Sequence, residues 1–194
     1  MNIAVFCASS QPRNPHFAEA AVALGQALAI GGHTLLYGGS NLGLMGEVSG
    51  EAMRCGGRVV AVIPTIFSEA VIRSQPVTEL VRVASMAERK EYLIAHSDAF
   101  IALPGGIGTL DEVSEVMVAN QLGIVRNRSG ARQAETGKPM ILLNIDGFYA
   151  PFLAQLRVMH EQGLMRTDGG LRAVASVEEC LSNLSNPSNL NNPI

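Results

Sequence analysis

A glycine-rich stretch, LPGGIGTLDE at residues 103–112, has the residue types of an anion site. Its glycines leave backbone N–H groups open to a ligand, and its threonine adds a hydroxyl where a helix is expected to begin. Backbone donors at a helix N-terminus bind phosphate groups well. The stretch therefore predicts a phosphate-binding loop formed by Gly105, Gly106, Gly108 and Thr109.

Carboxylates follow this loop directly, and two interpretations of Glu112 are open. Thr109 and Glu112 fit the capping box Thr-x-x-Glu, in which Glu112 would only bond back to the backbone of Thr109. Glu115 lies one turn further and would share a helix face with Glu112, where the two charges repel. A purely structural arrangement gains little from that second acid, so the pattern favours a catalytic role for Glu112.

A second glycine-rich loop, GGSNLGLMG at residues 38–46, joins an expected strand to an expected helix. It either binds a ligand, with Gly39 and Gly43 as candidates, or provides a tight turn. Its spacing is not GxGxxG and it has no P-loop lysine, which disfavours NAD and Walker-type nucleotide binding. Ser9, in the CASSQ loop after the first expected strand, is a further candidate for substrate contact.

Arg89 and Lys90 lie near the start of another expected helix, which Ser85 and Glu88 could open with a capping box. Arg89 could orient a substrate or neutralise an anion. The alternative is a solvated helix face beside Glu88 and Glu91. The four histidines show no metal-ligand spacing and GxSxG is absent, so we expect no metal, no cofactor and no acyl-transfer nucleophile.

The composition indicates one domain. The chain has 194 residues, of which 47% are hydrophobic, enough for one substantial core. The net charge of −3 disfavours a nucleic-acid partner, and no apolar run approaches the roughly 20 residues of a membrane span. Three cysteines without CxxC spacing predict reduced thiols in a cytoplasmic protein. The opening residues lack the basic region of a signal peptide, so we expect none.

Apolar runs alternate with stretches of helical periodicity along the chain. Strands are expected at 2–8, 33–39, 58–64, within 77–85, and at 99–106, 139–145 and 172–175. Helices are expected at 15–30, 44–55, 86–97, 110–122, 149–162 and 176–184. This alternation predicts an α/β fold with a Rossmann-like, doubly wound, mostly parallel sheet and helices on both faces. We expect a single domain over residues 1–184 and a polar tail at 185–194.

Several of these segments together resemble the LOG ("lonely guy") family. PGGIGTLDE is similar to the PGGxGTxxE motif of that family, MAERK to its MHxRK motif and YGGSNLGLMG to its GG(G)xxGLMG loop, in the same order along the chain. The resemblance implies a Rossmann-like homodimer that needs no cofactor. It implies hydrolysis of the N-glycosidic bond of nucleoside 5′-monophosphates, AMP and N6-modified AMP such as cytokinin riboside monophosphates, to free base and ribose 5-phosphate.

The resemblance also assigns roles to residues. Arg89 and Glu112 correspond to the catalytic pair of the family, and the loop from Gly105 to Thr109 corresponds to its phosphate site. Cleavage through an oxocarbenium-like state would let Glu112 stabilise the cation at C1′ or activate water, while Arg89 orients the nucleotide or assists the leaving base. Further substrate contacts are expected from Ser9, Gly39, Gly43, Met86, Lys90 and Glu115, the last through the ribose hydroxyls.

Three features depart from the family pattern and leave the preferred base open. Ala87 stands where the motif has histidine, Val118 and Ala119 stand where a Thr-Trp pair is common, and an Arg-rich stretch at 126–137 is either a lid or a solvated loop. The rival function is that of a non-hydrolytic nucleotide or molybdenum-cofactor carrier. Similar proteins have also been labelled lysine decarboxylases, but that chemistry needs a Schiff-base lysine and a large cofactor domain.

Overall fold

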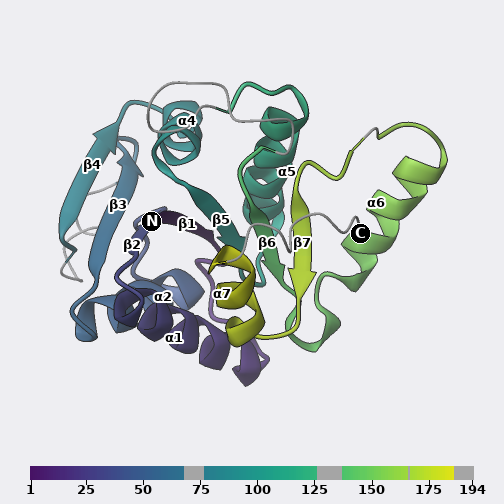
Figure 1. Cartoon of the computed structure of the whole chain (residues 1–194). Helices are drawn as coiled ribbons and strands as arrows, with labels where there is room; N and C mark the ends of the chain where they lie inside the picture. Colours follow the sequence, from purple (N-terminus) through teal and green to yellow (C-terminus); the bar gives the residue numbers. More distant parts are fainter. Residues whose placement is uncertain (68–76, 126–136, 166, 186–194) are drawn as a thin grey trace.

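A seven-stranded parallel sheet forms the centre of the computed structural model, which describes residues 1–67, 77–125, 137–165 and 167–185. The strand order is β4-β3-β2-β1-β5-β6-β7. The strands are β1 (Asn2–Phe6), β2 (Thr34–Tyr37), β3 (Arg58–Pro64), β4 (Glu79–Val83), β5 (Ala99–Ala102), β6 (Met140–Leu143) and β7 (Leu171–Val174). Every neighbouring pair is parallel, which confirms the predicted doubly wound α/β fold (Figure 1).

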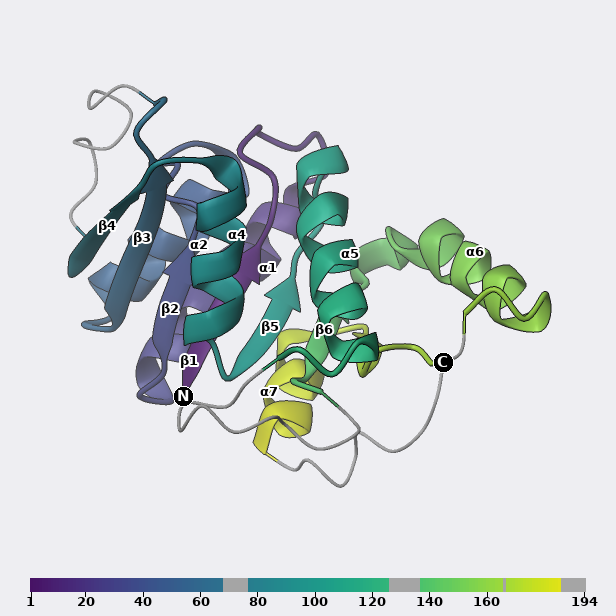
Figure 2. The ribbon, with the colours of Figure 1, turned by 90° about the horizontal axis from the view of Figure 1, so that it is seen from above.

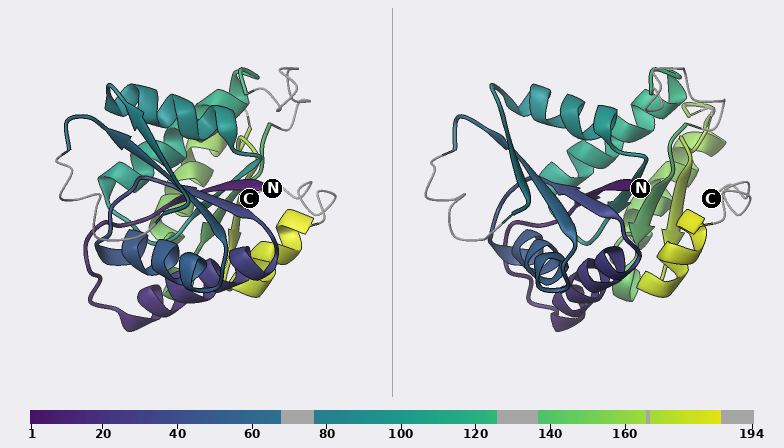
Figure 3. Two further views of the ribbon diagram at one scale, coloured as in Figure 1. Left: turned by 90° about the vertical axis from the view of Figure 1, so that its left-hand side faces the viewer. Right: turned by 60° about the vertical axis from the view of Figure 1, so that its left-hand side comes forward.

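Helices cover both faces of the sheet, as Figures 2 and 3 show. One face carries α1 (Pro15–Ile30), α2 (Gly43–Arg54) and α7 (Val177–Ser185), and the other carries α4 (Met86–His96), α5 (Ile107–Gln121) and α6 (Ala150–Glu161). A short 3₁₀ turn, η1 (Ile145–Gly147), follows β6. Each strand sends alternate side chains into the two layers, so two cores form, one beneath each set of helices.

The chain reverses its winding between β1 and β5. From β1 it moves outward through β2, β3 and β4, and it then returns to place β5 on the other side of β1. Ile3 pairs with Leu35 of β2 and with Ala99 of β5. The carboxyl ends of β1 and β5 therefore open at the topological switch point, where doubly wound folds bind ligands.

Helix α5 begins earlier than the sequence pattern predicts. It starts at Ile107 rather than at residue 110, and its N-cap is Gly106, so Thr109 lies inside the first turn. The capping box of Thr109 and Glu112 is therefore wrong. The capping box of α4 is confirmed in part: the N–H of Glu88 donates to Ser85 Oγ at 3.1 Å, but the Glu88 carboxylate accepts from the N–H of Ala84, one residue before the N-cap, at 2.8 Å.

Several sequence-based expectations fall partly or wholly outside the described residues. The Arg-rich stretch at 126–137 is described only at its last residue, and the tail at 185–194 only at its first. Within the described part of the chain, no helix combines the length and apolarity needed to cross a membrane. The described residues likewise contain no cluster of three or more His, Cys, Asp or Glu side chains that could hold a metal ion.

Candidate active site

A cavity of about 260 Å³ lies at the carboxyl edge of the sheet, at the switch point. Its walls come from the loop after β1, the first turns of α4 and the first turns of α5. Seven of the predicted site residues line it: Ser9, Met86, Arg89, Gly106, Gly108, Thr109 and Glu112. Segments far apart in the sequence thus meet where the glycine loops and the MAERK segment had suggested a site.

Arg89 and Glu112 form a buried ion pair across this cavity. Nη2 of Arg89, from α4, donates to Oε1 of Glu112, from α5, at 2.5 Å. The side chains are only 9% and 6% exposed. The solvated-face interpretation of Arg89 is therefore wrong, and the Glu112 carboxylate bonds to a side chain rather than to the Thr109 backbone. A buried pair of this kind needs both partners, since losing one leaves an unpaired charge out of water.

The electrostatic surroundings make Glu112 a weaker acid than usual. Burial raises the pKa of Glu112, and the charge and hydrogen bond of Arg89 oppose that rise without cancelling it. The charge of Asp111 raises the pKa of Glu112 slightly, and the charge of Lys90 lowers it slightly. A carboxylate with a raised pKa can accept a proton near neutral pH more readily than an exposed one. Its raised pKa and its place in the cavity lining make Glu112 a candidate for a general base.

The glycines of the two loops divide into open and filled positions. Gly106 and Gly108 have empty space where a Cβ would stand, so a ligand can approach their backbone. Gly105 does not, because a Cβ there would overlap the side chain of Thr109, whose own Cβ lies 2.6 Å from that point. The buried Thr109 is thus packed on Gly105 and lines the cavity.

Gly39 and Gly43 lie beside the cavity rather than in its lining. Both have positive φ, at 80° and 57°, a conformation that favours glycine. A Cβ on Gly39 would collide with Ile63, and one on Gly43 would collide with the backbone of Ser9 and Ser10. Gly43 therefore lets α2 approach the Ser9 loop closely, and the tight-turn interpretation explains both positions.

Lys90 and Glu115 face each other instead of the cavity. Nζ of Lys90 lies 2.5 Å from Glu115 Oε2 and 3.0 Å from Asp111 Oδ2. These two carboxylates, with Glu115 the larger influence, raise the pKa of Lys90. Asp111 also lines the cavity, a position that the sequence analysis did not single out. The position of Asp111 directly after the glycine loop could have indicated that it lies at the site.

Cys7 is a second residue that the sequence analysis missed. It follows β1 directly, is 2% exposed and lines the cavity. Burial raises the pKa of the Cys7 thiol far above its usual value, and the nearby Glu112 carboxylate raises it further. The thiol therefore stays protonated, and it contributes a neutral wall rather than a nucleophile.

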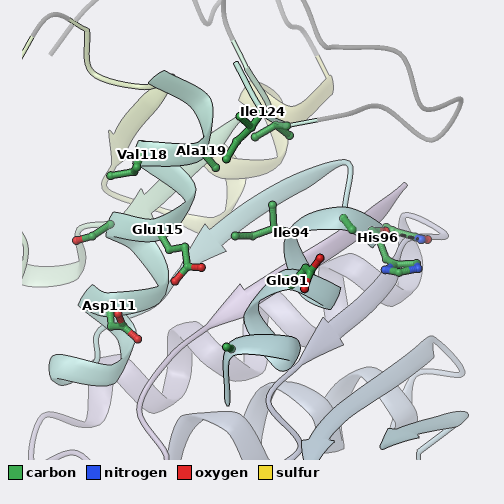
Figure 4. Close-up of a pocket in the computed structure, with 13 residues that line it drawn as sticks. Glu91, Ile94, His96, Asp111, Glu115, Val118, Ala119 and Ile124 are labelled. Atoms are coloured by element: carbon green, nitrogen blue, oxygen red, sulfur yellow. Dashed lines mark hydrogen bonds between the residues drawn. The ribbon is translucent and has the colours of Figure 1, made fainter. Parts of the chain in front are cut away.

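A larger groove of about 1120 Å³ runs between α4 and α5 and adjoins the site at Asp111, which lines both hollows (Figure 4). Ile94 and Val118 line its apolar part, and Glu91 and Glu115 project into it from the two helices. The three positions that depart from the motif pattern, Ala87, Val118 and Ala119, all line this groove. Small or aliphatic residues there replace the larger His and Trp of the pattern, so the departures shape the groove and leave the ion pair intact.

Comparison with known proteins gives the family. Residues 45–182 match a family model described as "Possible lysine decarboxylase". The cytokinin riboside 5′-monophosphate phosphoribohydrolase LOG of Oryza sativa subsp. japonica is 42% identical over 167 residues, which cover 86% of this chain and 64% of the relative. The cytokinin riboside 5′-monophosphate phosphoribohydrolase LOG4 of Arabidopsis thaliana is 42% identical over 86% of this chain and 72% of the relative. The chain belongs to the LOG family.

Solved structures share the fold of this LOG-family chain. A molybdenum cofactor binding protein from Rippkaea orientalis matches with a TM-score of 0.67 and 26% identity, over 95% of this chain and 94% of that one. The molybdenum cofactor carrier protein of Chlamydomonas reinhardtii matches with a TM-score of 0.67 over 95% of both chains, at 22% identity. At 22% identity, the match to the Chlamydomonas protein shows a shared fold and nothing more.

The lysines of this LOG-family chain do not fit a decarboxylase. The sequence has two, and neither lines the small cavity. Lys90 is held by two carboxylates. Lys138 is 2% exposed and its Nζ donates to the carbonyl of Ile94 at 2.7 Å, while burial lowers its pKa. Neither is placed to attack a carbonyl of a cofactor at this site.

Proposed function

We propose that this protein hydrolyses the N-glycosidic bond of nucleoside 5′-monophosphates, with AMP and N6-modified AMP as substrates. The observation that carries the proposal is the buried Arg89–Glu112 pair, which borders a cavity shared with the N-terminus of α5. The relatives named as cytokinin riboside 5′-monophosphate phosphoribohydrolases support this choice of reaction and substrate class. The chain spans only 64% of the length of the rice relative.

The 5′-phosphate would bind at the N-terminus of α5. Gly106 and Gly108 offer open backbone N–H groups there, and Thr109 lines the cavity. The 15-residue helix adds partial positive charge at this end. These are the features of a phosphate site built from neutral donors. Ser9 and Met86, on other walls of the cavity, would contact the rest of the nucleotide.

Glu112 would act at the opposite end of the sugar. It lies six residues beyond Gly106, which at 1.5 Å per residue is about 9 Å along the axis of α5. The Glu112 side chain tilts back toward the helix N-terminus, so its carboxylate lies nearer than this backbone rise and within the span of a ribose 5-phosphate. It would then face C1′ when the phosphate occupies the helix N-terminus. As the C1′–N bond breaks, positive charge grows at C1′ and Glu112 stabilises it. Glu112 also takes a proton from the water that attacks C1′.

Arg89 completes the arrangement from α4. Its guanidinium holds Glu112 in place and can orient the nucleotide or assist the departing base. The base leaves with a proton that balances the one Glu112 takes from water, and ribose 5-phosphate keeps the new hydroxyl at C1′. Glu115 and Lys90 would influence the ribose end from just outside the cavity, since Lys90 also binds the cavity residue Asp111.

Base release from nucleotides tests this function. The protein is incubated separately with AMP, isopentenyl-AMP, GMP and CMP, and chromatography measures the free base. Release of adenine or N6-modified adenine, at a rate that Arg89→Ala lowers at least about 100-fold, is the expected result. Nucleotide binding without any release would instead favour the carrier function suggested by the shared fold of the molybdenum cofactor binding protein.

We also propose a cytoplasmic homodimer, as the family resemblance implies. Three free thiols fit a reducing compartment. Half-exposed apolar side chains on the groove between α4 and α5, Val118 at 51% and Ile124 at 58%, are surface that a second subunit could bury. Light scattering should give the mass of a dimer, and Val118→Glu should shift it toward the monomer. A monomeric wild-type protein would reject this part of the proposal.

A further inference from the structure

Gly38 lies directly beneath the guanidinium of Arg89. It follows the last residue of β2, Tyr37, and opens the GGSNLGLMG loop. A Cβ added to Gly38 would overlap Nη2 of Arg89 and would lie 2.8 Å from Cζ and 3.3 Å from Nε. The guanidinium therefore occupies the space that any other residue type would fill with its side chain.

Few polar contacts hold this guanidinium. Besides the bond to Glu112, Nη1 makes a weak contact of 3.8 Å with the sulfur of Met86. Nε is buried and has no hydrogen-bond partner within the described residues. The shape of the surrounding backbone must therefore fix where the guanidinium lies, and Gly38 provides the surface closest to it.

We infer that Gly38 is a positioning residue, whose missing side chain forms the slot that keeps Arg89 against Glu112. The inference rests on the proposed function for its kinetic test, but not for its structural one. Its neighbour Gly39 has a different task, because a Cβ there would collide with Ile63 in the core and its φ is 80°. Gly38 thus leaves room for Arg89 at the site, whereas Gly39 allows the turn and the core packing next to it.

Gly38→Ala should displace Arg89 while the fold persists, because the added methyl meets the movable end of a side chain. A misplacement of about 1 Å can cost about 100-fold in rate, so we expect kcat to fall about 10- to 100-fold with a smaller change in KM. The groups that influence Glu112 are Arg89, Lys90, Asp111 and the nearby Cys7. Only Arg89 moves, and its charge lowers the pKa of Glu112, so the acid limb of the pH–rate profile should shift to higher pH.

A structural measurement separates this inference from the proposed function. Carbon-13 NMR of the Glu112 carboxyl should show its pKa rise in Gly38→Ala, whatever reaction the protein catalyses. In an Arg89→Ala background, where the slot is empty, Gly38→Ala should add no further rise. The matched control Gly39→Ala should lower the melting temperature without moving the Glu112 titration.

Two outcomes would overturn the inference: an unmoved Glu112 titration in Gly38→Ala, or an equal rise with and without Arg89. If Gly38→Ala fails to fold, the double variant Gly38→Ala/Arg89→Ala decides, since it has room for the methyl. Folding of the double variant alone supports the slot, and failure of the double variant while Arg89→Ala by itself folds rejects it. Absence of base release by the wild-type protein would reject the proposed hydrolase and leave the titration result standing.

Discussion

Glu112→Gln should nearly abolish catalysis and leave most of the stability intact. Glutamine has the shape of glutamate and keeps an oxygen that can accept from Nη2 of Arg89. It removes the negative charge, however, and with it both the proton acceptor and the stabilisation of a cation at C1′. We therefore expect kcat to fall at least about 100-fold, the usual minimum for loss of a general base.

The stability cost follows from the ion pair. A hydrogen bond to a charged group contributes about 1.5–3 kcal/mol and a neutral one about 0.5–1.5 kcal/mol, so the change weakens the contact with Arg89 by roughly 1 kcal/mol. Removal of a carboxylate that is only 6% exposed offsets this loss, because burial raises the pKa of Glu112 more than Arg89 lowers it. The melting temperature of a chain of this size should therefore change by no more than about 4 °C in either direction.

Glu51→Gln is the matched control. It breaks another Arg–Glu pair, that of Arg54 and Glu51, whose Nη2–Oε1 distance is 2.6 Å. That pair lies on α2 at the surface, where the Arg54 side chain is 67% exposed. Such pairs add little, so neither the melting temperature nor the rate of base release should change measurably. If Glu112→Gln retained more than a third of the wild-type kcat, or lost activity only through KM, the catalytic role would be rejected.

Stability should also depend on pH through Glu112. Its pKa in the folded protein is raised by burial, so the folded state binds the proton more tightly than the unfolded chain does. The stability that protonated Glu112 contributes is fully present below the unfolded pKa of about 4.3 and is lost as pH rises through the folded value. Glu112→Gln does not titrate, so the unfolding free energy of wild type minus variant should fall across this window. A rise in this difference would mean that Arg89 stabilises the charged form of Glu112 more than burial destabilises it.

Two further predictions concern the fold. Asn120→Ala should lower the unfolding free energy by about 2–4 kcal/mol in urea titrations, because the Asn120 amide bonds to Lys138 N, Lys138 O and Gly169 O and their loss leaves buried groups unpaired. Little change would mean that water replaces the amide. An aromatic disulfide reagent should modify the part-buried Cys55 in the native protein but not Cys7 or Cys180, since burial raises the pKa of Cys180 to about 12. Rapid modification of all three thiols would contradict the buried placement.

Much of the architecture could be predicted because its causes are local. Each strand is an apolar run and each helix shows its own periodicity, so the alternation alone indicated a parallel sheet with helices on both faces. Loop boundaries were less accurate. The strand expected at 99–106 ends at Ala102, because Pro104 has no N–H to continue the ladder and glycines follow it. Thr109 and Glu112 match the Thr-x-x-Glu capping box, so the pattern favoured Thr109, although glycine caps a helix about as well as threonine and Gly106 is the N-cap.

The Arg89–Glu112 ion pair could not be predicted from sequence spacing, because its two residues are 23 positions apart. On its own helix, Arg89 has Glu88 and Glu91 as neighbours, and local rules place it on a solvated face. The fold turns it inward instead, against α5. Only the resemblance to family motifs linked Arg89 with Glu112. The slot at Gly38 had no sequence signal beyond a second glycine, since a turn alone could account for the pair of glycines.

Helix α4 explains why several carboxylates can follow the glycine loop at residues 105–108. Arg89 binds Glu112, and Lys90 binds Asp111 and Glu115, so three acids from α5 meet two cations. These cations are already neutralised, and they are poorly placed to hold a phosphate as well. In the proposed function the phosphate would then depend on the N–H groups and the dipole at the start of α5. With that division, the Glu112 carboxylate, held by Arg89, would face the one part of the nucleotide that becomes positive during the proposed reaction.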